Sequence, residues 1–278
     1  MTTETENLAA TLARVLPTAL VFPSMIDPSV MQFAVPNAMT LKEIDLERLL
    51  PSPRRTVAVA KFSDAASFIA YVLTHKEVGT TAWCKFDPQT FALSFAAVID
   101  EHAAGVPGWR SHRAEYTPDM SAEWKAWKGK HAIGFSQVDF AEWLEEHAED
   151  IAAKAGMPTG LDMLTMATNF HSNEERVLKS SVKLQSGGVR LTYTADADTG
   201  TVESMQMFDR FALGIPVFQG REGWGMEARL KYRVKAGSVS FFYELVRADR
   251  VHLADAKELI DQIRDAIGDV PLLMGAIA

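Results

Sequence analysis

Cysteine is almost absent from the chain, since Cys84 is the only one among its 278 residues. An intramolecular disulfide and a metal site built from several thiolates are therefore excluded, and a lone thiol suits a reducing compartment. Because Cys84 lies inside an apolar stretch, Trp83 to Phe86, we predict that it is buried and does not act as a nucleophile.

Long apolar runs are also missing. The most apolar early stretch, 15–22, is interrupted by Pro17, and the apolar tail 271–278 is far shorter than the ~20 residues that a membrane helix needs. The first residues are acidic rather than basic, so we expect no secretory signal. These observations predict a soluble protein with no membrane contact, and its lone thiol suits the cytoplasm.

An excess of positive charge is lacking as well. The chain holds 28 Lys and Arg against 36 Asp and Glu, which gives a net charge of -8. This balance excludes a protein coated in basic charge that binds nucleic acids or anionic membranes indiscriminately. Local basic patches are still allowed.

No internal repeat or low-complexity tract is present, and the length favours about two domains. We predict an α+β fold with a boundary near residue 172. A mixed α/β N-terminal part, residues 1–172, is followed by an antiparallel β-sheet with a C-terminal packing helix, residues 173–278. The two parts could share one core.

Caps, turns and hydrophobic periods predict the individual elements. In chain order, we expect a helix at 41–50, a strand at 56–62, and a helix that is capped by Ser63 and ends near His75. Strands are expected next, at 80–86, 91–99 and 109–116. Two helices capped by Ser121 and Ser136 follow, the second of which reaches about residue 153, and a further helix is expected at 160–170. From about residue 174 the period changes to two, with hairpin turns at 186–188 and 235–237. A final helix is expected at 254–267, with Asp255 in its cap.

Alternating cations are the strongest functional signal. In residues 228–235 (ARLKYRVK) every second side chain is a cation, so four cations share one face of the predicted strand. Such a row, with an aromatic residue among the cations, can follow a phosphate backbone and stack unpaired bases. The predicted residues for binding nucleic acid or another polyanion are Lys179, Lys183, Arg190, Arg229, Lys231, Arg233, Lys235 and Phe242.

Charge is also distributed unevenly along the chain. Residues 171–250 hold 12 Lys and Arg against 10 Asp and Glu, whereas residues 1–170 hold 14 against 21. The alternative explanation is an ordinary solvated or partner-covered sheet face, because lysines also protect edge strands from pairing. The order of the strands decides whether the cations converge.

Asp100, His102 and His112 form a candidate metal site. Carboxylate and imidazole groups bind many divalent metals, and a metal-dependent nuclease would need these three side chains to converge. The informative spacings, such as two histidines four apart on a helix, are missing. We therefore predict no cofactor and favour a non-enzymatic role, with catalysis left open.

Two further patterns have structural explanations. Trp109, Trp124, Trp127 and Trp143 cluster in the middle of the chain, but Trp124 and Trp127 share a helix face, which favours core packing over a ligand cage. The glycine-rich segment 220–225 lacks the Gly-Lys-Ser/Thr end of a phosphate loop, which favours a connection between strands.

Several separated motifs occur along the chain in this order: 51–55 (PSPRR), 67–72 (SFIAYV), 75–76 (HK), 79–80 (GT), 107–109 (PGW), 112–113 (HR), 123–127 (EWKAW), 136–137 (SQ), 140–141 (FA), 215–218 (IPVF), 228–233 (ARLKYR) and 243–247 (YELVR). Together they resemble the YfdQ-like family of uncharacterised phage and prophage proteins, over roughly residues 40–250.

The resemblance implies a phage or prophage product of the bacterial cytoplasm, often encoded near genes of DNA metabolism. It supplies no catalytic residues. With the basic strand face, it favours an accessory protein that binds single-stranded DNA or another polyanion. The alternatives are a host-interaction or counter-defence protein that binds a bacterial protein, and a self-assembling homo-oligomer whose tail 271–278 docks between copies.

Overall fold

The computed structural model of the chain describes residues 50–170, 207–233 and 239–277 completely. Elsewhere it describes only the backbone of short strand segments, at 20–23, 31–34, 190–192, 204–206, 234–235 and 238. The helix expected at 41–50, apart from its last residue, and the hairpin turn expected at 186–188 lie outside the described residues.

The chain divides into two compact units, residues 1–55 and 56–278. In the first unit, strands β1 (Leu20–Pro23) and β2 (Met31–Ala34) form an antiparallel pair. All helices and strands with described side chains belong to the second unit, which holds a five-stranded and a four-stranded sheet. Strands β8 (Arg190–Thr192) and β9 (Ser204–Gln206) form a further antiparallel pair.

The first sheet of the second unit has five strands in the order β13-β4-β5-β6-β3. Its strands are β3 (Ala58–Phe62), β4 (Thr81–Phe86), β5 (Leu93–Val98), β6 (His112–Tyr116) and β13 (Leu272–Met274). The two edge strands lie parallel to their neighbours, and the inner pairs are antiparallel. Helix α2 (Ala65–His75) packs on one face through Phe68, whose ring contacts Phe95 and Tyr116.

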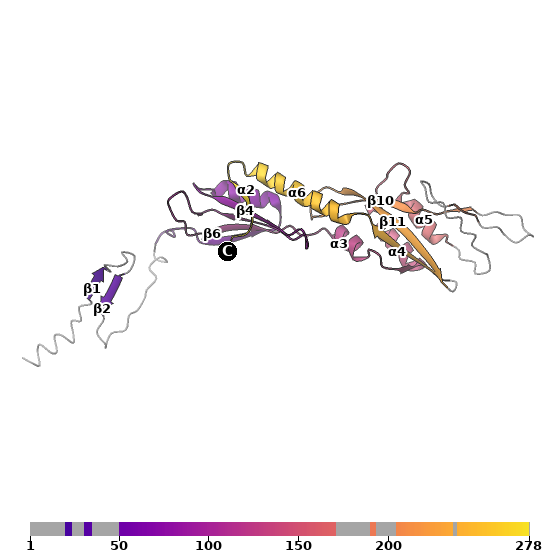
Figure 1. Cartoon of the computed structure of the whole chain (residues 1–278), viewed down its shortest axis with the longest axis horizontal. Coiled ribbons are helices and arrows are strands. Elements are labelled where there is room, and N and C mark those ends of the chain that lie inside the picture. The colour runs from indigo at the N-terminus through magenta and orange to yellow at the C-terminus, as the bar shows by residue number, and fades with distance from the viewer. Residues whose placement is uncertain are drawn as a thin grey trace, which may run out of the picture. The chain divides into compact units, whose positions relative to one another are not determined.

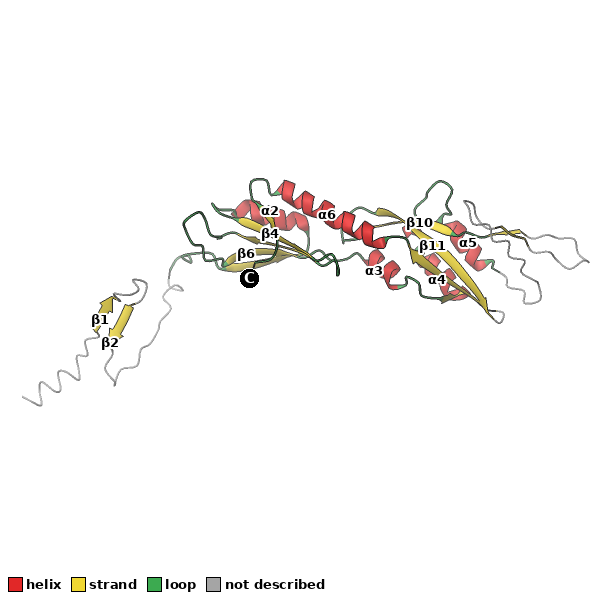
Figure 2. Ribbon diagram, in the orientation of Figure 1, coloured by secondary structure: helices red, strands yellow, loops and turns green. Residues whose placement is uncertain are grey.

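The second sheet has four antiparallel strands in the order β10-β11-β12-β7. They are β7 (Phe135–Ser136), β10 (Arg210–Ile215), β11 (Trp224–Lys235) and β12 (Ser238–Leu245). Beside this sheet lie helices α3 (Ala122–Gly129), α4 (Gln137–Glu146) and α5 (Gly160–Thr168), as Figure 2 shows. Phe140 of α4 stacks on Phe241 of β12 at 5.0 Å between ring centroids, so α4 covers the inner face of the sheet.

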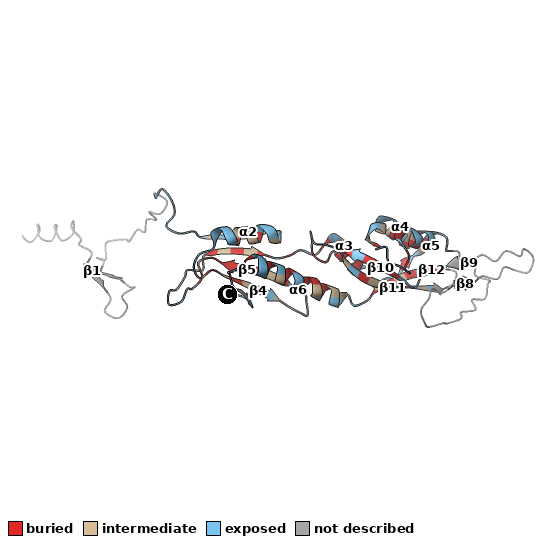
Figure 3. Ribbon diagram, turned by 90° about the horizontal axis from the view of Figure 1, so that it is seen from above, coloured by how far each residue is buried: buried red, intermediate tan, exposed pale blue. Residues whose placement is uncertain are grey.

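Helix α6 (Ala248–Ala266) runs along both sheets and packs against α2 and β11 (Figure 1). Its stripe of Leu259, Ile260 and Ile263 is buried, as its period predicts. One cluster of buried side chains contains residues from both sides of residue 172, and Figure 3 shows this buried layer along both sheets. The two predicted parts therefore contribute to a shared core.

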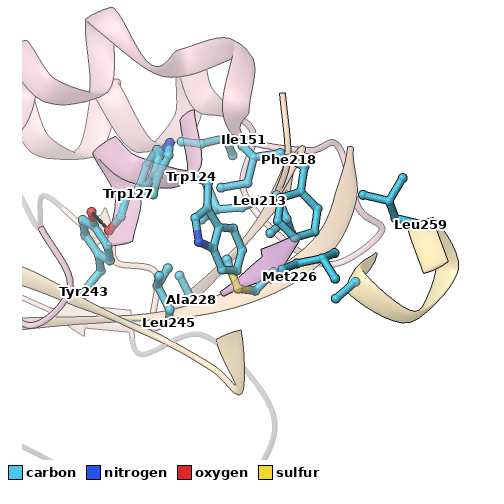
Figure 4. Packing of buried hydrophobic residues seen from close by; sticks show 14 of the residues in the cluster. Trp124, Trp127, Ile151, Leu213, Phe218, Met226, Ala228, Tyr243, Leu245 and Leu259 are labelled. Carbon is cyan, nitrogen blue, oxygen red and sulfur yellow. Dashed lines mark hydrogen bonds between the residues drawn. The ribbon is translucent and has the colours of Figure 1, made fainter. Parts of the chain in front are cut away.

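Trp124 and Trp127 belong to that core, as predicted from their shared helix face. Figure 4 shows them packed near Leu213, Met226 and Tyr243, where the Tyr243 hydroxyl donates a hydrogen bond of 2.8 Å to the Trp127 carbonyl oxygen. Cys84 is fully buried, and burial raises the pKa of its thiol to about 11. The prediction that Cys84 is buried is thus confirmed.

The α+β class is confirmed, and so are most of the expected elements. Ser121 and Ser136 cap α3 and α4, and Asp87 accepts hydrogen bonds inside the turn between β4 and β5. Strands β11 and β12 flank the turn expected at 235–237 and pair antiparallel. The segment 216–223 connects β10 to β11, so the glycine-rich stretch lies mostly in a connection, as predicted.

Several expected helix boundaries are wrong. Helix α2 is capped by Asp64 rather than Ser63, because the Asp64 carboxylate accepts the Ser67 N–H. Helix α4 ends at Glu146 instead of about 153, since the chain tightens into a 3₁₀ turn (Ala148–Asp150) and Ile151 then pairs with Leu213 of β10. Helix α6 begins at Ala248, so Asp255 lies inside the helix and is not a cap.

Long-range pairing created elements that periodicity did not predict. Strand β7 has two residues and pairs with β12, and β13 has three residues and pairs with β4. Part of the apolar tail 271–278, which the self-assembly alternative places between copies, forms β13 in the chain's own sheet, with Met274 opposite Cys84. Among the described residues, no helix is both long and apolar enough to cross a membrane.

Candidate polyanion-binding face

The outer face of the four-stranded sheet carries the predicted cations. Along β11, Ala228 and Leu230 are buried while Arg229, Lys231 and Arg233 are exposed, so the strand alternates as its sequence predicts. Side chains two residues apart are about 6.7 Å apart along a strand. The three arginine and lysine side chains therefore form a continuous outward row.

Strand β12 supplies the neighbours of this row. Its register places Glu244 opposite Arg229, Phe242 opposite Lys231 and Ser240 opposite Arg233. Phe242 is therefore on the outer face, as predicted, and the Arg233 guanidinium lies over its ring, 5.8 Å from the centroid. Phe241 and Tyr243 point inward and are fully buried.

Two carboxylates neutralise part of the positive charge. Lys231 Nζ lies 2.6 Å from Glu244 Oε1, and this hydrogen bond lowers the pKa of Glu244. Lys154 Nζ lies 2.7 Å from Glu227 Oε1 and lowers the pKa of Glu227 in the same way. Both carboxylates are therefore ionised at neutral pH.

Strand β10 adds a cation, Arg210, that was not predicted from the sequence to lie on this face. Arg210 lies opposite Arg229 in the register, and its guanidinium is 3.8 Å from Glu227. Only strand order reveals this neighbour, because β10 is otherwise apolar along its length. With Arg210 and Lys154, the outer face has five described cations against the two carboxylates of Glu227 and Glu244.

A hollow of about 380 Å³ lies at one end of this face. It is lined by Met207, Phe208, Asp209, Leu230, Lys231, Tyr232, Arg233 and Phe242. Strand β11 continues to Lys235, whereas β10 begins at Arg210, so the hollow lies where β11 extends past its neighbour. The hollow thus joins aromatic side chains to two cations of the row.

The other predicted binding residues are only partly described. Lys179 and Lys183 lie outside the described residues. Arg190 is placed by its backbone alone, in β8 opposite Gln206, and Lys235 by its backbone opposite Ser238. Of the predicted set, Arg229, Lys231, Arg233 and Phe242 have described side chains, and these four share one face.

The candidate metal residues Asp100, His102 and His112 form hydrogen bonds in and around the loop between β5 and β6. Asp100 accepts hydrogen bonds from the backbone N–H groups of Ser111 and His112, and together these outweigh burial and lower the pKa of Asp100. His102 Nδ1 accepts the Gly108 N–H, and His112 Nε2 lies 2.8 Å from the Tyr71 hydroxyl. Within the described parts of the chain, no group of three or more His, Cys, Asp and Glu side chains is arranged to hold a metal ion.

This loop also explains a strand that is shorter than expected. Strand β6 begins at His112 rather than 109, because Asp100 binds the backbone just before it and Arg110 adopts a left-handed φ of 55°. Trp109, beside that turn, is 76% exposed.

The burial of two ionisable residues of α6, His252 and Asp255, was not predicted from the sequence. Asp255 is fully buried and accepts a 2.6 Å hydrogen bond from Arg221 Nε, which comes from the connection between β10 and β11. His252 is 1% exposed and lies among the rings of Phe91, Trp124 and Phe218. The two residues are three positions apart on one helix, a spacing that is also common on solvent-exposed helix faces, so only the fold shows that their side chains are buried.

Comparisons with known proteins place the chain in a family. No curated protein matches the sequence, and no solved structure matches the fold. The sequence does match the family described as "Uncharacterized conserved protein (DUF2303)" over residues 4–277, which is almost its whole length. The chain therefore belongs to the DUF2303 family of uncharacterised conserved proteins.

Proposed function

We propose that the chain binds nucleic acid, with the sugar-phosphate backbone held against the outer face of β10, β11 and β12. The observation that carries the proposal is the outward row of Arg229, Lys231 and Arg233 on one exposed strand. Phosphate groups are recognised by such cations, and backbone contacts supply most of the affinity in sequence-independent binding.

The charge balance of the face supports the proposal. Glu227 pairs with Lys154 and Arg210, and Glu244 pairs with Lys231, so five cations against two carboxylates leave a positive excess on this face of a protein whose net charge is -8. A polyanion is therefore attracted to this face and repelled by the acidic remainder of the surface. The resemblance to YfdQ-like phage and prophage proteins supports a setting in the bacterial cytoplasm, close to DNA metabolism.

The test is a titration of labelled single-stranded DNA with the purified, nuclease-treated protein at low and at physiological salt. We expect the affinity to fall as salt rises, because binding releases cations condensed on the DNA and this release is less favourable at higher salt. The Lys231→Glu/Arg233→Glu variant should lose at least tenfold in affinity. Since Glu at 231 would face Glu244, the milder Lys231→Gln/Arg233→Gln variant checks that the loss does not come from misfolding.

Lys125→Glu/Lys257→Glu is the matched control, because it makes the same change in net charge at exposed positions of α3 and α6. This control should bind like the wild type. Equal losses in both reversed variants would show a non-specific effect of net charge, and a folded 231/233 variant with unchanged affinity would refute the proposal.

A further inference from the structure

The hollow beside β11 brings together groups that suit an aromatic ring carrying hydrogen-bond donors. Phe208 and Phe242 are both half-buried and both line the hollow. Lys231 and Arg233 belong to its lining and to the outward row, and Asp209 adds a carboxylate. Its volume of about 380 Å³ lies within the usual range for small-ligand sites.

Phe242 is unusual for its position. Among the described outward residues of β10, β11 and β12, it is the only aromatic one, and its neighbours along the strand are Ser240 and Glu244. The half-buried Phe242 ring presents apolar surface on which a second planar ring can stack. The Arg233 guanidinium covers it in part, at 5.8 Å from the ring centroid.

The backbone geometry keeps the hollow next to the row. Leu230 N–H donates a 2.9 Å hydrogen bond to the Asp209 carbonyl oxygen, which ties the segment 207–209 to β11 where β10 begins. Met207 is buried and anchors the same segment in the core. The segment 207–209, which lines the hollow, is therefore fixed both by its hydrogen bond to β11 and by the burial of Met207.

We propose that this hollow receives one unpaired nucleobase of a strand whose phosphates lie along Arg229, Lys231 and Arg233. The base stacks against Phe242, and the Asp209 carboxylate accepts a hydrogen bond from an exocyclic amino group. Paired bases of a duplex are stacked inside the helix and do not enter. The inference rests on the proposed function and extends it to a preference for single strands.

Three probes of similar total charge test the inference on the full chain: a 20-nucleotide single strand of mixed sequence, a duplex and inorganic polyphosphate. We expect the wild type to bind the single strand at least tenfold more tightly than the duplex. Phe242→Leu should weaken single-strand binding about 5- to 100-fold, since stacking on one aromatic contributes that much. Its affinity for polyphosphate should stay within twofold of the wild-type value.

Two variants and one optical signal complete the experiment. Phe242→Tyr keeps an aromatic face and should restore single-strand binding, while Trp109→Leu removes an exposed aromatic elsewhere and should change nothing. A single 2-aminopurine in the strand should lose fluorescence on binding to the wild type, because it stacks, and should keep it with Phe242→Leu.

The outcomes separate the two proposals. If Phe242→Leu binds the single strand like the wild type while Lys231→Gln/Arg233→Gln weakens it, the base site is wrong and the cationic face stands. Equal affinity of the wild type for single strand and duplex also overturns the base site. If none of the three probes binds in a salt-dependent manner, the proposed function itself fails.

Discussion

At the residue scale, the fold places histidine 252 in an environment that opposes its charge. Its side chain stacks on Phe91 at 4.6 Å between centroids, and within the described structure neither ring nitrogen has a hydrogen-bond partner. Burial, together with the nearby charge of Lys128, lowers the pKa of His252 to about 4. The imidazole is therefore neutral in the folded protein at pH 7.

This environment predicts a loss of stability in weak acid. The unfolded chain takes up the proton near pH 6.5 and the folded chain only near pH 4, so this contribution is complete above pH 6.5 and is lost as the pH falls toward 4. The loss amounts to about 3 kcal/mol. In urea unfolding, the free-energy difference between wild type and His252→Leu should shift by that amount between pH 7.5 and pH 4.

Leucine fits the apolar surroundings and does not titrate, which isolates this one group from the carboxylates that also weaken the fold in acid. The exposed His75→Leu serves as the control for replacing an imidazole by leucine elsewhere in the chain. If the difference between wild type and His252→Leu were the same at every pH, the burial argument would be wrong.

Residue patterns on β11 could be predicted because a strand has a fixed period of two. The burial of Ala228 and Leu230 and the exposure of Lys231 and Arg233 follow from that period alone. Arg210 could not be found in this way, because its role depends on which strand lies next to β11. The burial of His252 and Asp255 was not predicted for a similar reason, since helix periodicity does not show which elements pack against the helix.

At the element scale, the loop between β5 and β6 is fixed by backbone contacts. A Cβ at Gly108 would lie 2.1 Å from the Asp100 carbonyl oxygen and 2.5 Å from that of Glu101. Glu101 Oε1 also receives a 2.5 Å hydrogen bond from Arg110, so both ends of the loop are held. Backbone atoms held in this way cannot move aside for a methyl group.

We therefore expect Gly108→Ala to destabilise the fold by about 2 to 4 kcal/mol, through steric overlap with backbone. Gly129→Ala is the comparison, because nothing lies within 4 Å of its added Cβ and it belongs to α3. Alanine there should be neutral or stabilising by up to about 1 kcal/mol. Thermal unfolding of both variants checks the contrast, and similar melting temperatures would contradict it.

Local chemistry also explains which elements were predictable. Ser121 and Ser136 cap their helices because a hydroxyl followed by a carboxylate favours a helix start. The start of α6 was placed six residues late because Arg247 precedes it in a left-handed conformation without a side-chain cap. Strands β7 and β13 are too short to show a period, so only their distant partners define them.

At the whole-molecule scale, the late segment β13 protects the early strand β4. Ala82 N–H donates to the Pro271 carbonyl oxygen at 2.9 Å, and Gly275 N–H donates to the Cys84 carbonyl oxygen at 2.8 Å. Cys84 is fully buried, and its raised pKa keeps the thiol protonated. The rate at which this thiol reacts therefore shows whether β13 covers the edge of β4.

Truncation after residue 270 should expose β4 and make Cys84 react with a thiol reagent under native conditions. The full chain should react only as it unfolds, because a buried protonated thiol is a poor nucleophile. Truncation after residue 275 keeps β13 and its hydrogen bonds, and it should behave like the full chain. Equally slow labelling of all three chains would show that β13 does not protect this edge.

The pairing of β13 with β4 also determines when the five-stranded sheet can form during protein synthesis. About 190 residues separate the two strands, so at synthesis rates of 5–20 residues per second a ribosome needs roughly 10 to 40 s between them. During that interval β4 can pair with β5 but not with its second neighbour. The five-stranded sheet is therefore completed only after β13 has been synthesised, and until then the nascent chain presents an apolar strand edge that chaperones can recognise.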